Sequence, residues 1–172
     1  SPLNLSTFEG FKNAGMDLLK DHREDFPPEY LYWMDKGYQM GVTDFFRDQE
    51  LRTEIYDAIQ SVLENYDLLI TPTLACMPVD NATDGNTMGP KEINGEPVDP
   101  LIGWALTYLV NFTGHPAASI PAGLSADKLP IGMQIIGRRY ADHDVLAASQ
   151  RFEDIRPWSE HYQICRDRNI SA

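Results

Sequence analysis

Two short apolar segments constrain the fold of this chain more than any other feature. Ala117–Ile120 and Ile131–Ile136 are each bounded by glycine and proline, which end regular structure rather than continue it. Pro130 fixes its own φ and pushes the residue before it to an extended conformation, so it marks the start of the second segment. We therefore expect two strands, paired as a hairpin or joined by a crossover, with apolar residues on both faces inside a larger sheet.

The residues before this pair predict three helices followed by one further strand. Pro28 suits the first turn of the second helix, and Thr43 suits the N-cap of the third. The continuous apolar run Leu68–Ile70 is typical of a buried strand. Apolar residues at helical spacing, together with this run, predict helices over 7–23, 28–40 and 43–64 and a strand over 66–71.

Residues 74–100 are expected to form a long loop, which in a compact domain is usually functional or disordered. Asn94-Gly95 inside it favours a small hairpin. Asp99 and Pro100 favour the start of a helix over 101–111, and this helix should be buried because it has no polar face. A last helix is predicted over 145–154, burying Leu146, Ala147 and Phe152.

These elements predict one α/β region over 1–172, with helices packed on a few strands of a mixed sheet. Its helical part covers 1–65, and its strand-and-helix part covers 66–172 and includes the loop 74–100. The length of 172 residues allows a sizeable core.

Charge and composition limit the partners of this region. The net charge is −12 and the pI is about 4.6, which disfavours binding to nucleic acid or to anionic membranes. No apolar run reaches the roughly 18 residues of a transmembrane helix, and no signal peptide is recognisable. The chain begins with serine, which favours a piece of a longer chain. We expect a cytoplasmic protein.

Two sequence blocks carry recognisable motifs. One has the pattern N-x-x-G-x-P-A-x-S-x-P-x-G followed by L-P-x-G-x-Q-x-x-G, and the other is Asp67–Thr73. The first pattern is carried by Asn111, Gly114, Pro116, Ala117, Ser119, Pro121, Gly123, Leu129, Pro130, Gly132, Gln134 and Gly137. Both blocks resemble the C-terminal region of the amidase signature family, and the second resembles the family's D-x-L-L-x-P-T strand, with Ile70 where leucine is usual. The resemblance implies the C-terminal part of the amidase-signature fold and hydrolysis of a carbon–nitrogen bond in a non-peptide amide, with no cofactor or metal.

The catalytic residues that the resemblance implies are missing from this chain. Members of the family use a Ser–Ser–Lys triad, in which lysine activates the nucleophilic serine through a bridging serine. Their glycine- and serine-rich block lies upstream of the region matched here, and this sequence contains no such block. The resemblance therefore implies no catalytic residue in this chain, which should be inactive alone. The N-terminal part of the same amidase and a small-molecule amide substrate are the expected partners.

The resemblance also implies which residues line the substrate pocket. Glutamine-using members carry an aspartate about seven residues before the motif asparagine, and Trp104 occupies that position here. A tryptophan removes an ionic partner and offers an apolar ring, which favours an aryl or apolar acyl amide. Thr107 and Tyr108 follow on the next turn, and Met77 begins the loop that is a candidate pocket rim. The alternatives are a core tryptophan and a plain surface loop.

His115 and Ser119 are the other residues that invite a chemical interpretation. His115 either faces a pocket or is packed and hydrogen-bonded, and Ser119 is read as a structural hydroxyl rather than a nucleophile. None of the histidines has metal-ligand spacing.

Two alternative functions remain open from the sequence. One is a non-catalytic interaction or scaffold protein, and the other is the glutaminase component of a glutamine-dependent amidotransferase. A sheet interrupted at its edge would expose unpaired strands, so a homodimer is also possible.

Overall fold

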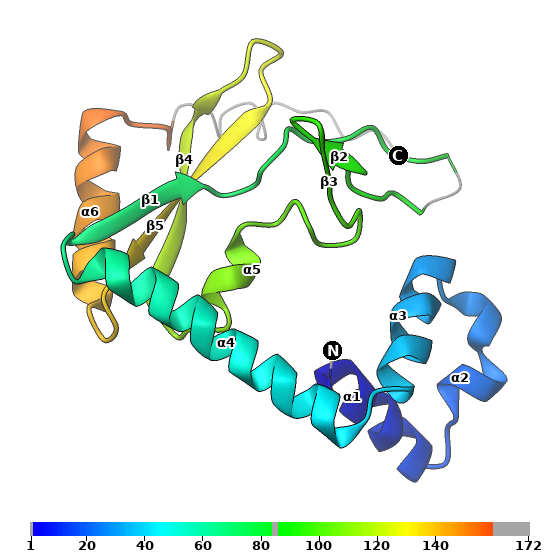
Figure 1. Cartoon of the computed structure of the whole chain (residues 1–172). Coiled ribbons are helices and arrows are strands. Elements are labelled where there is room, and N and C mark those ends of the chain that lie inside the picture. Colours follow the sequence, from blue (N-terminus) through cyan, green and yellow to red (C-terminus); the bar gives the residue numbers. More distant parts are fainter. Residues whose placement is uncertain (1, 84–85, 160–172) are drawn as a thin grey trace. The chain divides into compact units, whose positions relative to one another are not determined.

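The computed structural model describes residues 2–83 and 86–159 (Figure 1). Within them, six α-helices, one 3-10 helix and five strands follow one another along the chain. The chain divides into two compact units. One is Ser1–Leu51 with Asn81–Thr87, which we call the helical unit, and the other is Arg52–Asp80 with Met88–Ala172, which we call the sheet unit. Helix α4 (Val42–Leu63) contributes residues to both units.

The helical unit begins with α1 (Pro2–Asn13), α2 (Leu18–Asp21) and the 3-10 helix η1 (Arg23–Asp25). The prediction of one helix over 7–23 is wrong, because Gly15 has a φ of 91° and ends α1. The N–H groups of Gly15 and Met16 donate to the carbonyls of Lys12 and Phe11, each over 3.0 Å. This pattern is the Schellman motif, for which glycine is the usual residue.

Helix α3 (Pro28–Tyr38) confirms the second predicted helix, with Pro28 in its first turn. Aromatic rings fill the space between α1 and α3: Phe8 lies 5.5 Å from Phe26 and 6.2 Å from Tyr30, measured between ring centroids. Phe8 and Met34 are buried, so they form the core of this unit. The start of α4 is held by Asp44, whose carboxylate accepts the Gly41 N–H over 3.2 Å, as in a capping box.

The sheet unit contains a three-stranded sheet in the order β1-β5-β4. Its strands are β1 (Leu68–Pro72), β4 (Ala117–Leu124) and β5 (Pro130–Gly137). β4 and β5 form the predicted hairpin, and β1 pairs with β5 on its other side. Every strand pair in the described residues is antiparallel, so the expected mixed sheet is not found there. A short turn between β4 and β5 permits only this direction.

Helices cover both faces of the sheet at one end. Ile135 and Ile136 point to opposite faces because they are successive residues of a strand, and each is only 2% exposed. Ile136 packs with Leu63 at the end of α4 and with Val110 in α5 (Thr107–Val110). On the other face α6 (Asp142–Ile155) approaches so closely that a Cβ on Gly137 would lie 2.6 Å from Val145 (Figure 1).

The last predicted helix is present, but its buried side chains differ from the prediction. Val145 is buried, whereas Leu146 is 66% exposed and Ala147 is also exposed. Successive residues of a helix are rotated by about 100° around its axis. Because Val145 points toward the sheet, Leu146 points away from it.

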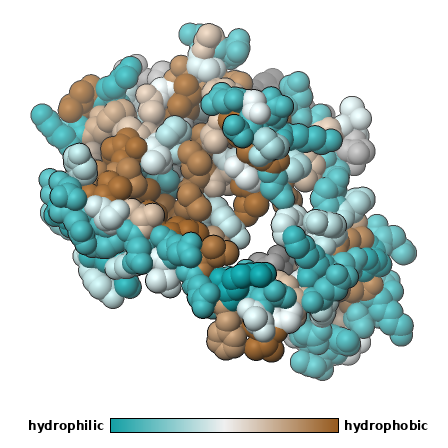
Figure 2. Space-filling model, viewed as in Figure 1, coloured by the Kyte–Doolittle hydropathy of each residue, from teal (hydrophilic) through white to brown (hydrophobic). Residues whose placement is uncertain are grey.

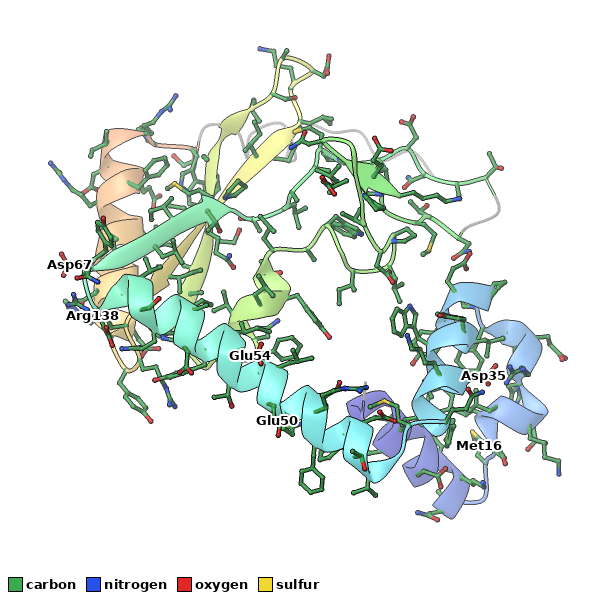
Figure 3. The ribbon with its side chains drawn as sticks, in the orientation of Figure 1. Met16, Asp35, Glu50, Glu54, Asp67 and Arg138 are labelled. Atoms are coloured by element: carbon green, nitrogen blue, oxygen red, sulfur yellow. The ribbon has the colours of Figure 1, made fainter. Side chains whose placement is uncertain are left out.

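Arg138 joins the end of α4 to the start of β1. Its Nε donates to the carbonyl of Leu63 over 2.9 Å, and one of its Nη groups donates to the carbonyl of Tyr66 over 3.2 Å. Its other Nη lies 3.1 Å from the carboxylate of Asp67 (Figure 3). The guanidinium therefore satisfies the Leu63 carbonyl, which the helix end leaves without an intrahelical partner, and the Tyr66 carbonyl just beyond the helix.

The segment between the loop and the hairpin differs most from the prediction. A helix was expected over 101–111, but only Thr107–Val110 is α-helical. The Ala75 N–H donates to the Trp104 carbonyl over 2.9 Å, and Leu74 forms a bridge with Ala105. This long-range backbone pairing uses groups that a continuous helix would need. Leu101, Tyr108 and Leu109 are also exposed, contrary to the expectation of a buried helix.

Candidate functional site

Trp104 is held in a defined orientation by residues of the 74–100 region. Its indole Nε1 donates to the Pro100 carbonyl over 3.0 Å, and its backbone carbonyl accepts the Ala75 N–H. The side chain is half-buried. The helix expected to carry Trp104 is absent at this position, because α5 begins at Thr107, and whether Trp104 contacts a substrate or belongs to the core stays a prediction.

Tyr108 and Thr107 lie on α5. Tyr108 meets Phe112 edge-on at 4.6 Å, and the Arg52 guanidinium lies 5.3 Å from the Phe112 ring centroid. Tyr108 thus belongs to a second aromatic group, which packs toward α4, while Trp104 packs against Pro100. Thr107 is half-buried at the start of α5. That these residues contact a substrate stays a prediction.

Met77 lies two residues beyond Ala75, the residue whose N–H holds the Trp104 backbone, and its side chain is 42% exposed. The backbone segment that carries Met77 is therefore hydrogen-bonded to the backbone at Trp104, through Ala75. The loop itself contains a hairpin, β2 (Glu92–Ile93) with β3 (Glu96–Pro97), closed by Asn94-Gly95 as predicted. Both turn residues have positive φ, 52° and 84°, as a type I′ turn requires.

A row of polar side chains crosses one face of the sheet, and sequence reasoning did not identify it. Thr71, Gln134 and Ser119 are register partners on the three strands. Gln134 donates to Thr71 Oγ1 over 3.1 Å, and the hydroxyls of Thr73 and Ser119 are 2.7 Å apart. A local signal was present, because Thr71 in β1 and Thr73 just after it are two residues apart, the spacing of side chains on one face of an extended chain, but the partner strands could not be read from it.

The hydroxyl of Ser119 is bonded to another hydroxyl, not to a base. A serine becomes a strong nucleophile when a positioned base accepts its proton, and a threonine hydroxyl does not do this. All five lysines of the chain are exposed. The geometry agrees with a structural role for Ser119.

His115 is packed and hydrogen-bonded rather than open to a pocket. Its side chain is 5% exposed, with Nδ1 2.9 Å from Thr113 Oγ1 and Nε2 3.3 Å from Gln60 Oε1. The ring stacks on Tyr56 at 5.3 Å. Burial lowers the pKa of His115 below its ordinary value, and the positive charge of Arg139 lowers this pKa further.

This pKa shift predicts how stability depends on pH. Below about pH 6.5 the unfolded chain takes up a proton that folded His115 resists, so the free energy of unfolding should fall as the pH decreases. Urea unfolding of the wild type and of His115→Gln at about pH 7 and about pH 5 measures this effect. The wild type should lose more stability on acidification. Equal losses in the wild type and His115→Gln would contradict the prediction.

A shallow hollow of about 270 Å³ lies in the helical unit and is unrelated to the predicted substrate residues. It is lined by Phe8, Lys12, Asp17, Leu19, Lys20 and Tyr38. Its charged rim does not suit an aryl amide. In residues 2–83 and 86–159 no cluster of three or more histidine, cysteine, aspartate or glutamate side chains is arranged for a metal ion. No helix in the same residues is both long and apolar enough to cross a membrane.

Comparisons with known proteins give the family directly. The profile of the amidase family matches residues 16–146. An acylamidase of Rhodococcus erythropolis is 30% identical over 147 residues, which cover 84% of this chain and 30% of the relative. A glutamyl-tRNA(Gln) amidotransferase component of Alkaliphilus metalliredigens is 32% identical over 155 residues, which cover 86% of this chain and 29% of that protein.

Solved structures agree with the profile. A bacterial aryl acylamidase of the amidase signature family superposes with a TM-score of 0.91 at 50% identity, covering 97% of this chain and 34% of that one. The corresponding glutamyl-tRNA(Gln) amidotransferase component of Thermotoga maritima gives a TM-score of 0.51 at 31% identity over 74% of this chain and 25% of that chain. The chain therefore spans about a third of the length of these relatives, and it belongs to the amidase signature family.

Proposed function

We propose that this chain forms one wall of the substrate pocket of an amidase that hydrolyses aryl acyl amides. In this proposal the serines and the lysine that perform the reaction come from the remaining part of the amidase, and the chain alone is inactive. Its own contribution is to position the aromatic part of the substrate through Trp104, with Thr107, Tyr108 and Met77 completing the wall.

The observation that carries the proposal is the extent of the match to the bacterial aryl acylamidase. Half of the aligned residues are identical, and nearly the whole chain superposes on a third of that enzyme. The lower identity and TM-score of the amidotransferase component favour the acylamidase over a glutaminase function. Trp104 supports the same choice, because an indole cannot form the ion pair that a glutamine substrate's amino group would require.

The surface of the sheet unit is suited to receive the rest of such an enzyme. β1 and β4 are the edge strands of the sheet in the described residues, and backbone groups on their outer sides are available for pairing. Large apolar side chains gather over this unit (Figure 2). Those exposed by about 40% to 50% include Ile70, Leu74, Met77, Leu101 and Ile131. We propose the N-terminal part of the amidase as their partner, and when that part is missing we expect the isolated chain to self-associate through the same side chains.

A chimaera tests the proposal. The matched third of the bacterial aryl acylamidase is replaced by this chain, and hydrolysis of 4-nitroacetanilide is followed by release of coloured 4-nitroaniline. We expect activity in the chimaera and none in the 172-residue chain. Light scattering of both proteins accompanies the assay, and the isolated chain should self-associate through its exposed apolar surface.

Each other outcome would change the assignment. Hydrolysis by the isolated chain would mean that it contains its own catalytic residues. A folded chimaera that hydrolyses glutamine but not anilides would support the glutaminase function. A folded chimaera that hydrolyses neither would favour the scaffold function.

A further inference from the structure

We infer that Gly89 is a positioning residue for substrate specificity, because the absence of a side chain there creates the seat in which the Trp104 indole is held. The inference rests on the proposed function, in which Trp104 contacts the aryl group of the substrate. Gly89 thereby joins the residues proposed to position the substrate, although it has no reactive side chain and lies 15 positions before Trp104 in the sequence.

The β2–β3 hairpin brings Gly89 opposite Pro100. Glu92 pairs with Pro97 and Ile93 with Glu96, and the Val98 N–H donates to the Lys91 carbonyl over 3.0 Å. The next bond outward joins the Gly89 N–H to the Pro100 carbonyl over 2.8 Å. Gly89 and Pro100 therefore close the base of a continuous ladder, which restricts their movement relative to each other.

The Pro100 carbonyl accepts two hydrogen bonds, one from Gly89 and one from the Trp104 indole. These bonds place the pyrrole edge of the indole directly over Gly89. A Cβ on Gly89 would overlap Nε1 and Cδ1 of Trp104, and would lie 2.8 Å from the Pro100 oxygen. Any side chain at position 89 must therefore displace the indole, the carbonyl that holds it, or both.

The seat also determines what Trp104 offers to a ligand. Its N–H is already donated and its pyrrole edge is packed, so in this inference the ligand contacts the benzene ring. Its backbone is fixed independently by the Ala75 N–H. A ring held in this way favours stacking with an aryl group over hydrogen bonding, and it loses little conformational freedom when the ligand binds.

The first experiment examines the seat in the 172-residue chain and needs no activity. The three tryptophans give three indole N–H signals in a ¹H–¹⁵N spectrum, and Trp104→Phe identifies the signal of Trp104. Gly89→Ala should shift that signal and accelerate its exchange with solvent, while the Trp33 and Trp158 signals stay unchanged. Gly10→Ala is the matched control, because no atom lies within 4 Å of a Cβ there.

The second experiment measures specificity in the active chimaera. Gly89→Ala should raise KM for acetanilide roughly three- to tenfold, as expected for the loss of one aromatic contact, and should leave kcat within about twofold. The inhibition constant of N-cyclohexylacetamide, which has a ring of similar size without aromatic character, should change by less than about twofold. Gly10→Ala should change none of these values.

The outcomes separate this inference from the proposed function. If the chimaera is inactive before any substitution, the proposed function fails, and the indole spectrum still decides whether Gly89 seats Trp104. If the Trp104 signal is unmoved by Gly89→Ala, the seat is refuted. If the signal moves but KM for acetanilide and the inhibition constant of N-cyclohexylacetamide rise by the same factor, the specificity role of Gly89 is refuted. Trp104→Leu leaves Gly89 intact and should raise KM for acetanilide at least as much, so the test remains available if Gly89→Ala accumulates poorly.

Discussion

Replacing Leu63 by alanine should lower the free energy of unfolding of the sheet unit by about 3 to 4 kcal/mol. Leu63 is the last residue of α4 and has no exposed surface. It packs with Val110 and Ile136, and the partly buried Ile59 and Leu69 surround this cluster. Truncation therefore removes apolar contacts and leaves a cavity bounded by α4, α5 and β5, which are elements distant in sequence and unable to close it by a local change.

Urea unfolding followed by tryptophan fluorescence measures this effect in a Trp33→Phe background, in which the remaining Trp104 and Trp158 both belong to the sheet unit. Leu146→Ala makes the same chemical change on α6 at a side chain that is 66% exposed, and should alter stability by less than about 0.5 kcal/mol. Similar values for the two variants would contradict the assignment of Leu63 to the core.

The elements that the sequence predicted correctly are those whose signals are local. The segments Ala117–Ile120 and Ile131–Ile136 became parts of β4 and β5, because glycine and proline limited them and apolar residues filled them. Asn94-Gly95 formed the expected turn, since few residue pairs adopt positive φ at both positions. The Schellman motif at Gly15 has a local signal too, the glycine itself, although the apolar pattern of a helix continues past it.

The errors have long-range causes. Residues 101–106 carry an apolar pattern and a favourable helix start at Asp99, whose side chain does accept the Leu101 N–H over 2.8 Å. Pairing of Leu74 with Ala105 then diverts the backbone, and nothing near residue 101 in the sequence indicates that partner. The candidate site likewise depends on contacts between residues that are distant in sequence. Trp104 could be selected by its position in the motif, but its seat depends on Gly89, and the Thr73–Ser119 hydroxyl pair depends on strand register.

Replacing Arg138 by alanine should lower the free energy of unfolding by about 2 kcal/mol, because two backbone carbonyls lose a charged donor. The bond to Leu63 matters most, since it is partly buried and ends the helix whose last side chain is in the core. Asp67 is 92% exposed, so its ion pair with Arg138 should contribute little. Asp67→Asn is therefore expected to change stability by less than about 0.5 kcal/mol.

Salt and a conservative replacement distinguish this explanation from a surface ion pair. If carbonyl capping dominates, the loss in Arg138→Ala should be nearly the same at low and high salt, because screening acts mainly on the exposed Asp67 contact. Arg138→Lys should recover less than half of the loss, since an ammonium is a single point charge and cannot reach Leu63 and Tyr66 with a planar fork. Urea unfolding at both salt concentrations measures these differences. If the loss of stability disappears at high salt, or if Asp67→Asn reproduces it, the ion pair holds the α4–β1 junction. If the loss persists at high salt, the Arg138 side chain anchors α4 to the sheet through the backbone carbonyls of Leu63 and Tyr66.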